Sequence, residues 1–250
     1  MGIFIFKTPN GFVFRNIAAI AALLGDEHMK QKISTRKMAL IALFCAFSYL
    51  CVFIFRIKVA FLTFDAKDAV MTIGGLLLGP VAGLFMALLT TLLEAITVSD
   101  TGFYGWLMNL ISSASFVLPV ALLYRYRKNI VSALVGLSAS IALTTSLMML
   151  ANTLITPLYM GVSRGEVVSL IPTLLLPFNL VKSILNAGIV LVLYKPVSEA
   201  LRRAGVHGVA SEDNKGFRLT PVSVAVFALG LLLAAFAILY FTEKMGGKII

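Results

Sequence analysis

The chain has 250 residues, of which 60% are hydrophobic and 13% are charged, and its formal net charge is +10. Soluble domains carry about 25% charged residues, so this composition excludes an ordinary soluble protein and indicates an integral membrane protein. Lysine and arginine gather at the ends of apolar segments, which is typical of membrane topology and of contact with anionic lipid, not of a nucleic-acid-binding face.

The first 28 residues differ from the rest. They contain an apolar stretch at 11–24, which is shorter than the about 20 residues that a membrane span needs. No small-residue cleavage site follows it, so it does not match a secretory signal peptide. Met29 offers a start of its own. We therefore interpret 1–28 as an N-terminal extension, either a mis-assigned start or a helix that lies on the membrane surface.

Six apolar segments beyond this extension predict transmembrane helices. They lie at about 38–57, 81–98, 106–124, 130–157, 173–194 and 220–241. A shorter apolar piece at 69–78 ends in Gly79-Pro80 and predicts a short second helix that turns directly into the third. The expected fold is an all-α integral membrane protein. A six-helix domain over 29–203 is followed by a cytoplasmic linker over 204–219 and by an appended seventh transmembrane helix with a short external tail over 220–250.

Three basic clusters predict which side of the membrane each loop occupies. They precede the first helix, follow the fourth, and lie between the sixth and the seventh. By the positive-inside rule these clusters are cytoplasmic, as is the N-terminus. The loops at 58–67, 99–104 and 158–172 and the C-terminus are then expected outside. Residues 59–65 alternate large apolar with small or polar side chains, which predicts extended chain lying as a cap over the bundle.

The first helix carries Ala42 and Ala46 one turn apart. Small residues at this spacing let another helix approach closely in lipid, where packing drives association. We interpret them as a candidate docking face, although alanine is common in any membrane helix.

Lys182 is the most informative polar residue, because it lies within an otherwise apolar span. A charge there costs about 2.5–3.5 kcal/mol on insertion scales, so it needs a partner or a watery cavity. Asn179 and Asn186 share its helix face, and we interpret the stripe as substrate-facing. The alternatives are that Lys182 snorkels to an interface or pairs structurally with an acid such as Glu94. Glu94 itself either neutralises Lys182 or lies at the external rim beside Asp100.

Two further sets of polar residues have competing interpretations. Asn152, in the fifth helix, is expected near the outer face at a depth comparable to Asn179, and its amide donors and acceptor need partners in a dry site. Asp65 and Asp68 are interpreted as caps of the short second helix, because aspartate favours helix N-termini.

The sequence lacks the motifs of the common catalytic classes. It contains no G-x-x-x-x-G-K-[ST] phosphate loop, no H-E-x-x-H and no G-x-S-x-G. Its two cysteines lie in one apolar segment and its two histidines stand alone in polar flanks, so neither a disulfide framework nor a metal site is expected. We therefore predict binding or translocation, not an enzyme, with no cofactor and no nucleic-acid partner.

From about residue 30 to 203 the chain resembles the substrate-binding S-components of energy-coupling factor (ECF) vitamin transporters, of the riboflavin type. The motifs that carry the resemblance are Ala42-xxx-Ala46, residues 61–65, the Gly79-Pro80 turn, residues 99–102, Ala151-Asn152 with 157–159, and the Pro-Phe-Asn-x-x-Lys element at 177–182. The last of these points to riboflavin. Thr90, Thr91 and Glu94 lie where relatives are often more basic, and the seventh helix is outside the family pattern.

The resemblance implies high-affinity riboflavin binding and uptake, powered by separate ATPase subunits. It implies that Asn152, Asn179, Lys182 and the backbone around Leu62 contact the flavin ring, and that Ala42 and Ala46 dock a membrane scaffold subunit that carries two cytosolic ATPases. Two alternatives stay open. One is an S-component for a different vitamin, whose carboxylate pairs with Lys182; the other is a membrane scaffold protein without a ligand.

Overall fold

The structure is a computed structural model that describes residues 35–54, 57–59, 62–98 and 102–206, with isolated positions between 221 and 236. Contacts within the chain divide it into residues 1–39 and 40–250. Of the first unit, only the opening turn of one helix is described. Within the described residues, five helices are long and apolar enough to cross a membrane. The chain is therefore an all-α, multi-pass membrane protein, as its composition predicts.

The helices follow the predicted order. They are α2 (Thr35–Ile54), α3 (Lys67–Leu78), α4 (Pro80–Thr97), α5 (Gly102–Tyr126), α6 (Ile130–Met160), α7 (Arg164–Ser169) and α8 (Leu176–Arg203), with a π-helical segment η1 (Ile171–Leu175) leading into α8. The five candidate spans are α2, α4, α5, α6 and η1 with α8. As predicted, α3 is too short to cross, and α5 begins four residues before the expected start at 106.

The turn between α3 and α4 is formed by Gly79 and Pro80, as expected from the sequence. Gly79 has a φ of 101°, a backbone conformation that residues with a Cβ atom rarely adopt. Pro80 occupies the first turn of α4, where its missing N–H costs no hydrogen bond. The short helix therefore reverses into α4 within two residues.

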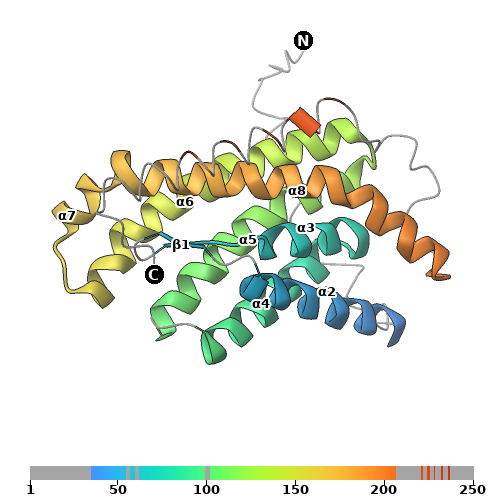
Figure 1. Ribbon diagram of the computed structural model, residues 1–250, viewed down its shortest axis with the longest axis horizontal. Helices are drawn as coiled ribbons and strands as arrows, with labels where there is room; N and C mark the ends of the chain where they lie inside the picture. The colour runs from blue at the N-terminus through green and yellow to red at the C-terminus, as the bar shows by residue number, and fades with distance from the viewer. Residues whose placement is uncertain are drawn as a thin grey trace, which may run out of the picture. The chain divides into compact units, whose positions relative to one another are not determined.

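The short helix α3 is enclosed by its neighbours. All but one of its residues are buried, and it packs against α4, α5 and α8 (Figure 1). At two glycines, the backbones of neighbouring helices come close together. A Cβ atom on Gly83 would lie 3.1 Å from the Gly75 Cα atom, and one on Gly136 would lie 2.8 Å from the Val120 Cα atom. Glycine is therefore needed where α4 crosses α3 and where α6 crosses α5.

The described residues of the loop that follows α2 are extended, as its alternating pattern predicts. Strands β1 (Ile57–Val59) and β2 (Leu62–Phe64) form an antiparallel hairpin in which Ile57 is opposite Phe64. The hairpin leads into α3 through Asp65 and Ala66. It is held to α8 by Phe64, whose ring centroid lies 4.3 Å from that of Phe178.

The expected loop at 158–172 is largely helical, so that prediction was wrong. The helix α6 continues to Met160, and α7 and η1 fill most of the remainder. A capping box starts α7: the Glu166 backbone N–H donates to the Ser163 hydroxyl at 3.2 Å, and the Ser163 N–H donates to the Glu166 carboxylate at 3.3 Å. The serine and the glutamate three positions on were a local signal for this helix.

Two sequence predictions lie outside the described residues. These are the N-terminal extension over 1–28 and all but the first three residues of the linker over 204–219; of the seventh helix, only isolated positions are described. The predicted division into four segments therefore stays a prediction, as does the side of the membrane on which each terminus lies.

Candidate ligand-binding site

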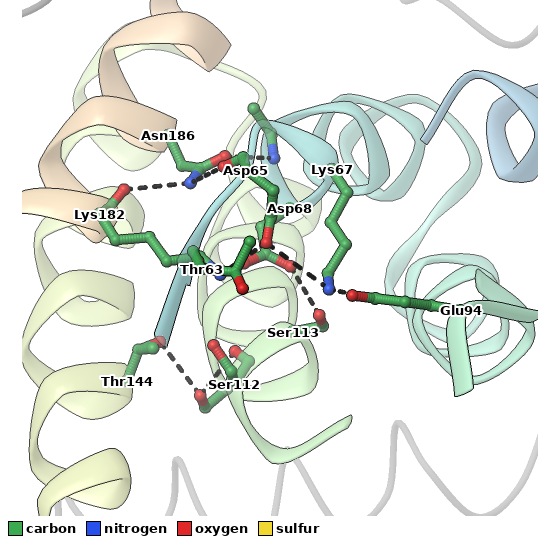
Figure 2. A network of polar contacts seen from close by, with 12 residues as sticks. Thr63, Asp65, Lys67, Asp68, Glu94, Ser112, Ser113, Thr144, Lys182 and Asn186 are labelled. Carbon is green, nitrogen blue, oxygen red and sulfur yellow. Dashed lines mark hydrogen bonds and ion pairs between the residues drawn. The ribbon is translucent and has the colours of Figure 1, made fainter. Parts of the chain in front are cut away.

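Five charged side chains are buried together where the hairpin meets α3, α4 and α8 (Figure 2). We call this group the charge cluster. Its members are Asp65, Lys67, Asp68, Glu94 and Lys182, and their exposed fractions range from 1% to 8%. Buried charges are tolerated only when they are paired and hydrogen-bonded, so the geometry of each pair determines what the cluster can do.

Lys182 is bound to the segment that joins the hairpin to α3. Its ammonium donates to the Asp65 carboxylate at 2.9 Å and to the Thr63 carbonyl at 3.3 Å, and lies 3.8 Å from the Asp68 carboxylate. An ammonium has three N–H donors. Within the described residues, two acceptors lie at hydrogen-bond distance, which leaves one donor for a further acceptor.

Lys182 pairs with an acid, as one alternative expected, but that acid is Asp65 and not Glu94. The Glu94 carboxylate forms an ion pair with Lys67, whose side chain is 1% exposed, and this pair joins α3 to α4. The Lys67 ammonium also lies 3.7 Å from the Asp65 carboxylate. Asp65 therefore lies between two ammonium groups, one from α3 and one from α8.

Neither aspartate is the N-cap of α3, which corrects the sequence interpretation. The N-cap is Ala66, which forms no side-chain cap hydrogen bond, and the first-turn N–H of Ala69 donates to Asn186 of α8. Asp68 instead accepts from the Ser113 hydroxyl of α5 at 2.6 Å. One Asp65 oxygen faces Lys182, and the other has no hydrogen-bond partner among the described residues.

The two aspartates have opposite pKa shifts. Burial raises the pKa of Asp65, but Lys182 and Lys67 outweigh it, so the net pKa lies below the ordinary value. Burial likewise raises the pKa of Asp68; Lys182 lowers it and Asp65 raises it, and the net direction is upward. Two neighbouring carboxylates commonly separate in this way, because ionisation of one disfavours ionisation of the other.

Asn186 fixes the start of α3 against α8. Its side-chain carbonyl accepts from the Ala69 backbone N–H at 2.9 Å, and its amide donates to the backbone carbonyls of Asp65 at 3.2 Å and Lys182 at 3.0 Å. Asn186 thus satisfies backbone groups of both segments, and it holds the Asp65 backbone beside Lys182.

The remaining predicted ligand contacts lie on the elements around the charge cluster. Leu62 is half-buried in β2, next to Thr63, and β2 packs on α8 through Phe64 and Phe178. Asn179 is buried one turn before Lys182, and its amide donates to the Leu175 carbonyl at 2.8 Å. The structure therefore brings the strand of Leu62 together with the helix of Asn179 and Lys182.

Asn152 has its described hydrogen bonds within its own helix. It is fully buried in α6, where its amide donates to the Met148 carbonyl at 2.7 Å and its carbonyl accepts from the Thr156 hydroxyl at 3.0 Å. The helices α6 and α8 run side by side (Figure 1). Among the described residues, however, the hydrogen bonds of Asn152 do not reach Asn179 or Lys182.

Ala42 and Ala46 both lie on the exposed face of α2, on the side opposite the buried Ile41, Phe44 and Cys45. The same face carries exposed large apolar residues, among them Leu43, Phe47 and Leu50. This face is accessible to lipid or to another helix.

Sequence reasoning missed Lys67 and the Thr63 carbonyl, and gave Asp65 a different role. A signal was present: residues 65–68 place three charges within four positions, at the start of a mostly apolar helix. Backbone groups such as the Thr63 carbonyl leave no trace in the residue types, so only the folded structure identifies them.

A family model described as "ECF transporter, substrate-specific component" matches residues 36–194. A curated relative is the Riboflavin transporter RibU of Staphylococcus aureus (strain TCH60). It is 28% identical over an alignment of 150 residues, and the match covers 57% of this chain and 78% of the relative.

A solved structure titled "Structure and mechanism of the S component of a bacterial ECF transporter" has the same fold. Its TM-score is 0.58 and its sequence identity 24%, over 67% of this chain and 98% of the other. The family is one of transporter components, not of enzymes. Because the family model covers more than half of its length, this chain belongs to the substrate-specific components of ECF transporters.

Proposed function

We propose that this chain binds riboflavin and mediates its uptake as the substrate-specific subunit of an ECF transporter. The proposal rests on the hydrogen bonds of Lys182. Its ammonium donates to the Asp65 carboxylate and to the Thr63 carbonyl, and its third N–H has no acceptor at hydrogen-bond distance among the described residues. Lys182 belongs to the Pro-Phe-Asn-x-x-Lys element, on which the resemblance to riboflavin S-components rests. The similarity to the riboflavin transporter of Staphylococcus aureus gives independent support.

The chemistry of the site suits a flavin. The pyrimidine edge of the ring system offers carbonyl acceptors and an N–H donor, which amide and ammonium groups satisfy together. We propose that Asn152, Asn179 and Lys182, with the backbone around Leu62, make these contacts. Asn152 and Asn179 then exchange part of their hydrogen bonding within the helix for bonds to the ligand.

The second candidate, an anionic vitamin that pairs with Lys182, is less favoured by the electrostatics. Two ammonium groups in the charge cluster stand against three carboxylates, which leaves one excess negative charge when all five are ionised. A ligand carboxylate would meet a lysine whose charge Asp65 already offsets, and like charges nearby would oppose it. A neutral ring with carbonyl acceptors avoids this repulsion.

We further propose that the exposed face of α2 around Ala42 and Ala46 docks a membrane scaffold subunit, which in turn carries two cytosolic ATPases. Small side chains permit close approach of a partner helix. The N-terminus is then cytoplasmic, and the C-terminus is external if the seventh helix spans the membrane.

The test is a ligand titration on the purified full chain in detergent, read by flavin fluorescence and by thermal melting. Riboflavin should bind, whereas biotin, which carries a carboxylate, should not. Asn152→Ala and Asn179→Ala should each weaken riboflavin binding by about 1–3 kcal/mol, the cost of an unsatisfied buried polar group. Thr153→Ala is a matched control, because its hydroxyl also donates within α6, to the Met149 carbonyl, from a half-buried position.

Each outcome of the titration has a distinct meaning. Binding of biotin alone would favour the anionic candidate. If neither vitamin shifts the melting temperature, riboflavin and biotin are both excluded as ligands. A membrane scaffold protein without a ligand would require that no other vitamin shift it either. Unchanged riboflavin affinity in both asparagine variants would remove these residues from the site.

A further inference from the structure

The ion pair between Lys67 and Glu94 is the part of the charge cluster that the proposed ligand contacts do not use. Lys67 is 1% exposed and Glu94 5% exposed, and they belong to adjacent helices, α3 and α4. Taking two charges out of water is costly, and hydrophobic residues of similar volume are often as stabilising as a buried pair. Stabilising the packing of α3 on α4 does not by itself account for a charged pair at this position.

Lys67 has a second neighbour that connects it to the proposed ligand contact. Its ammonium lies 3.7 Å from the same Asp65 oxygen that accepts from Lys182 at 2.9 Å. The contacts thus run from Glu94 to Lys67, from Lys67 to Asp65 and from Asp65 to Lys182, across α4, α3 and α8 (Figure 2).

We infer that Lys67 is a positioning residue for ligand binding, which acts through Asp65 to keep the Lys182 ammonium free for the ligand. Lys67 offsets part of the Asp65 charge, so Lys182 is not the sole cation beside Asp65 and Asp68. Without Lys67, the Lys182 ammonium would be drawn between the two carboxylates, one now 2.9 Å and the other 3.8 Å away. Its third donor would then be less available. This inference rests on the proposed contact between Lys182 and the ligand.

Glu94 has a different part in the same arrangement. Its carboxylate neutralises the positive charge of Lys67, and it holds the lysine side chain from the α4 side. If only Glu94 is replaced, Lys67 still lies beside Asp65. If Lys67 and Glu94 are both replaced by neutral residues, Lys182 is the one ammonium group of the described residues left beside Asp65. Two variants can therefore separate the ion pair between the helices from the charge beside Asp65.

The experiment measures the riboflavin dissociation constant, the absorption spectrum of the bound flavin and the melting temperature of the full chain. The double variant Lys67→Met/Glu94→Gln removes both charges and leaves the net charge of the cluster unchanged. We expect its riboflavin affinity to fall about tenfold, as for the loss of one good hydrogen bond. The spectrum of the bound flavin should change, because Lys182 no longer donates to the ring in the same way.

The single variant Glu94→Gln breaks the ion pair but keeps Lys67 beside Asp65. We expect a lower melting temperature with riboflavin affinity within about threefold of the wild type, because the cation that positions Lys182 is retained. A purely structural role predicts that affinity and stability fall together. If Glu94→Gln loses affinity as far as the double variant, or if the double variant binds as the wild type does, the positioning role is wrong.

Tyr124→Phe is the matched control for loss of a buried contact between helices. It removes the 2.9 Å hydrogen bond between Tyr124 and Tyr194. Tyr194 lies about 18 Å beyond Lys182 along α8, at a rise of about 1.5 Å per residue. Tyr124→Phe should therefore lower the melting temperature without changing the riboflavin dissociation constant. If the double variant does not fold, the single variant Lys67→Gln takes its place. A riboflavin affinity equal to that of Tyr124→Phe would then show that the positioning role is wrong. If the wild-type chain itself binds no riboflavin, the proposed function fails, and that outcome is distinct from the ones above.

Discussion

At the residue scale, the central feature is that a lysine within a membrane helix is held by a loop and not by another span. Lys182 of α8 binds the Thr63 carbonyl of β2 and the carboxylate of Asp65, which follows that strand. Asn186, one turn further on, binds the backbone groups of Asp65 and of Ala69 in α3. The proposed ligand contact and the attachment of the hairpin therefore share one helix face.

The opposite pKa shifts of Asp65 and Asp68 predict opposite effects of the two asparagine variants on stability at pH 7. Asp65→Asn removes the carboxylate that lies 2.9 Å from the Lys182 ammonium and 3.7 Å from the Lys67 ammonium. Loss of this charged partner should lower the free energy of unfolding by about 3–5 kcal/mol. Asp68→Asn should leave it unchanged or raise it, because the folded chain disfavours the ionised form of Asp68. The amide that replaces this carboxylate can still accept from the Ser113 hydroxyl through its carbonyl oxygen.

The pH dependence follows from the signs of the shifts. The pKa of Asp65 is lowered on folding, so its stabilisation is present above the unfolded pKa, about 3.9, and is lost as the pH falls through the folded value. The pKa of Asp68 is raised, so the wild type loses stability as the pH rises from the unfolded towards the folded value, and Asp68→Asn lacks this loss. Thermal melting of the wild type and both variants across the pH range checks these expectations. An equal loss of stability in Asp65→Asn and Asp68→Asn at pH 7 would contradict the opposite pKa shifts.

At the scale of elements, α3 is the helix around which the site is organised. It does not reach across the membrane, yet almost all of it is buried against α4, α5 and α8. The turn at Gly79 and Pro80 fixes its end, and its start is fixed by Asn186 and the charge cluster. Because both ends are held, the hairpin that precedes it has a defined place beside α8.

The exposed face of α2 yields a prediction about coupling. Ala42→Trp or Ala46→Trp should block close approach of a partner helix, so that assembly with the ATPase module and uptake are lost while riboflavin binding is retained. The assays are co-purification with the module and riboflavin titration of the isolated chain. Ala142→Trp is the control, because Ala142 is an exposed alanine of α6. Co-purification at wild-type levels in the α2 variants would mean that the docking face lies elsewhere.

At the scale of the whole molecule, the described contacts of the charge cluster and of the predicted ligand residues all come from residues 62–186. That 29–203 is the substrate-binding domain, with the terminal segments appended to it, stays a prediction. The structure adds one detail near the boundary: Val206, just beyond α8, packs against the main hydrophobic core.

A chain trimmed to 29–203 should therefore still bind riboflavin. The predicted linker of about 16 residues is expected to act as a loose tether, at about 5–6 Å times the square root of its length. Removal of the predicted seventh helix is therefore expected to open no cavity. A chain trimmed to 29–206 retains Val206 and should melt at a higher temperature than 29–203. Fluorescence titration and thermal melting check both. A trimmed chain that folds but has lost its ligand would show that a terminal segment packs into the site.

The sequence by itself determined the membrane class, the order and approximate bounds of the helices, the short α3 and the Gly79-Pro80 turn. These features depend on local properties: the length of an apolar run, the conformational freedom of glycine and the missing N–H of proline. The capping box that starts α7 was equally local, and the prediction missed it because 158–172 was treated as one loop.

Only the tertiary structure decided the partners of the buried charges. Lys182 and Asp65 are 117 positions apart in the chain, and Lys67 and Glu94 are 27 apart. Composition required that each buried charge have a counter-charge, but three acids were available to two lysines. Which acid meets which lysine depends on how α3, α4 and α8 pack. That packing is set by close approaches such as Gly75 with Gly83, which no local pattern in the sequence encodes.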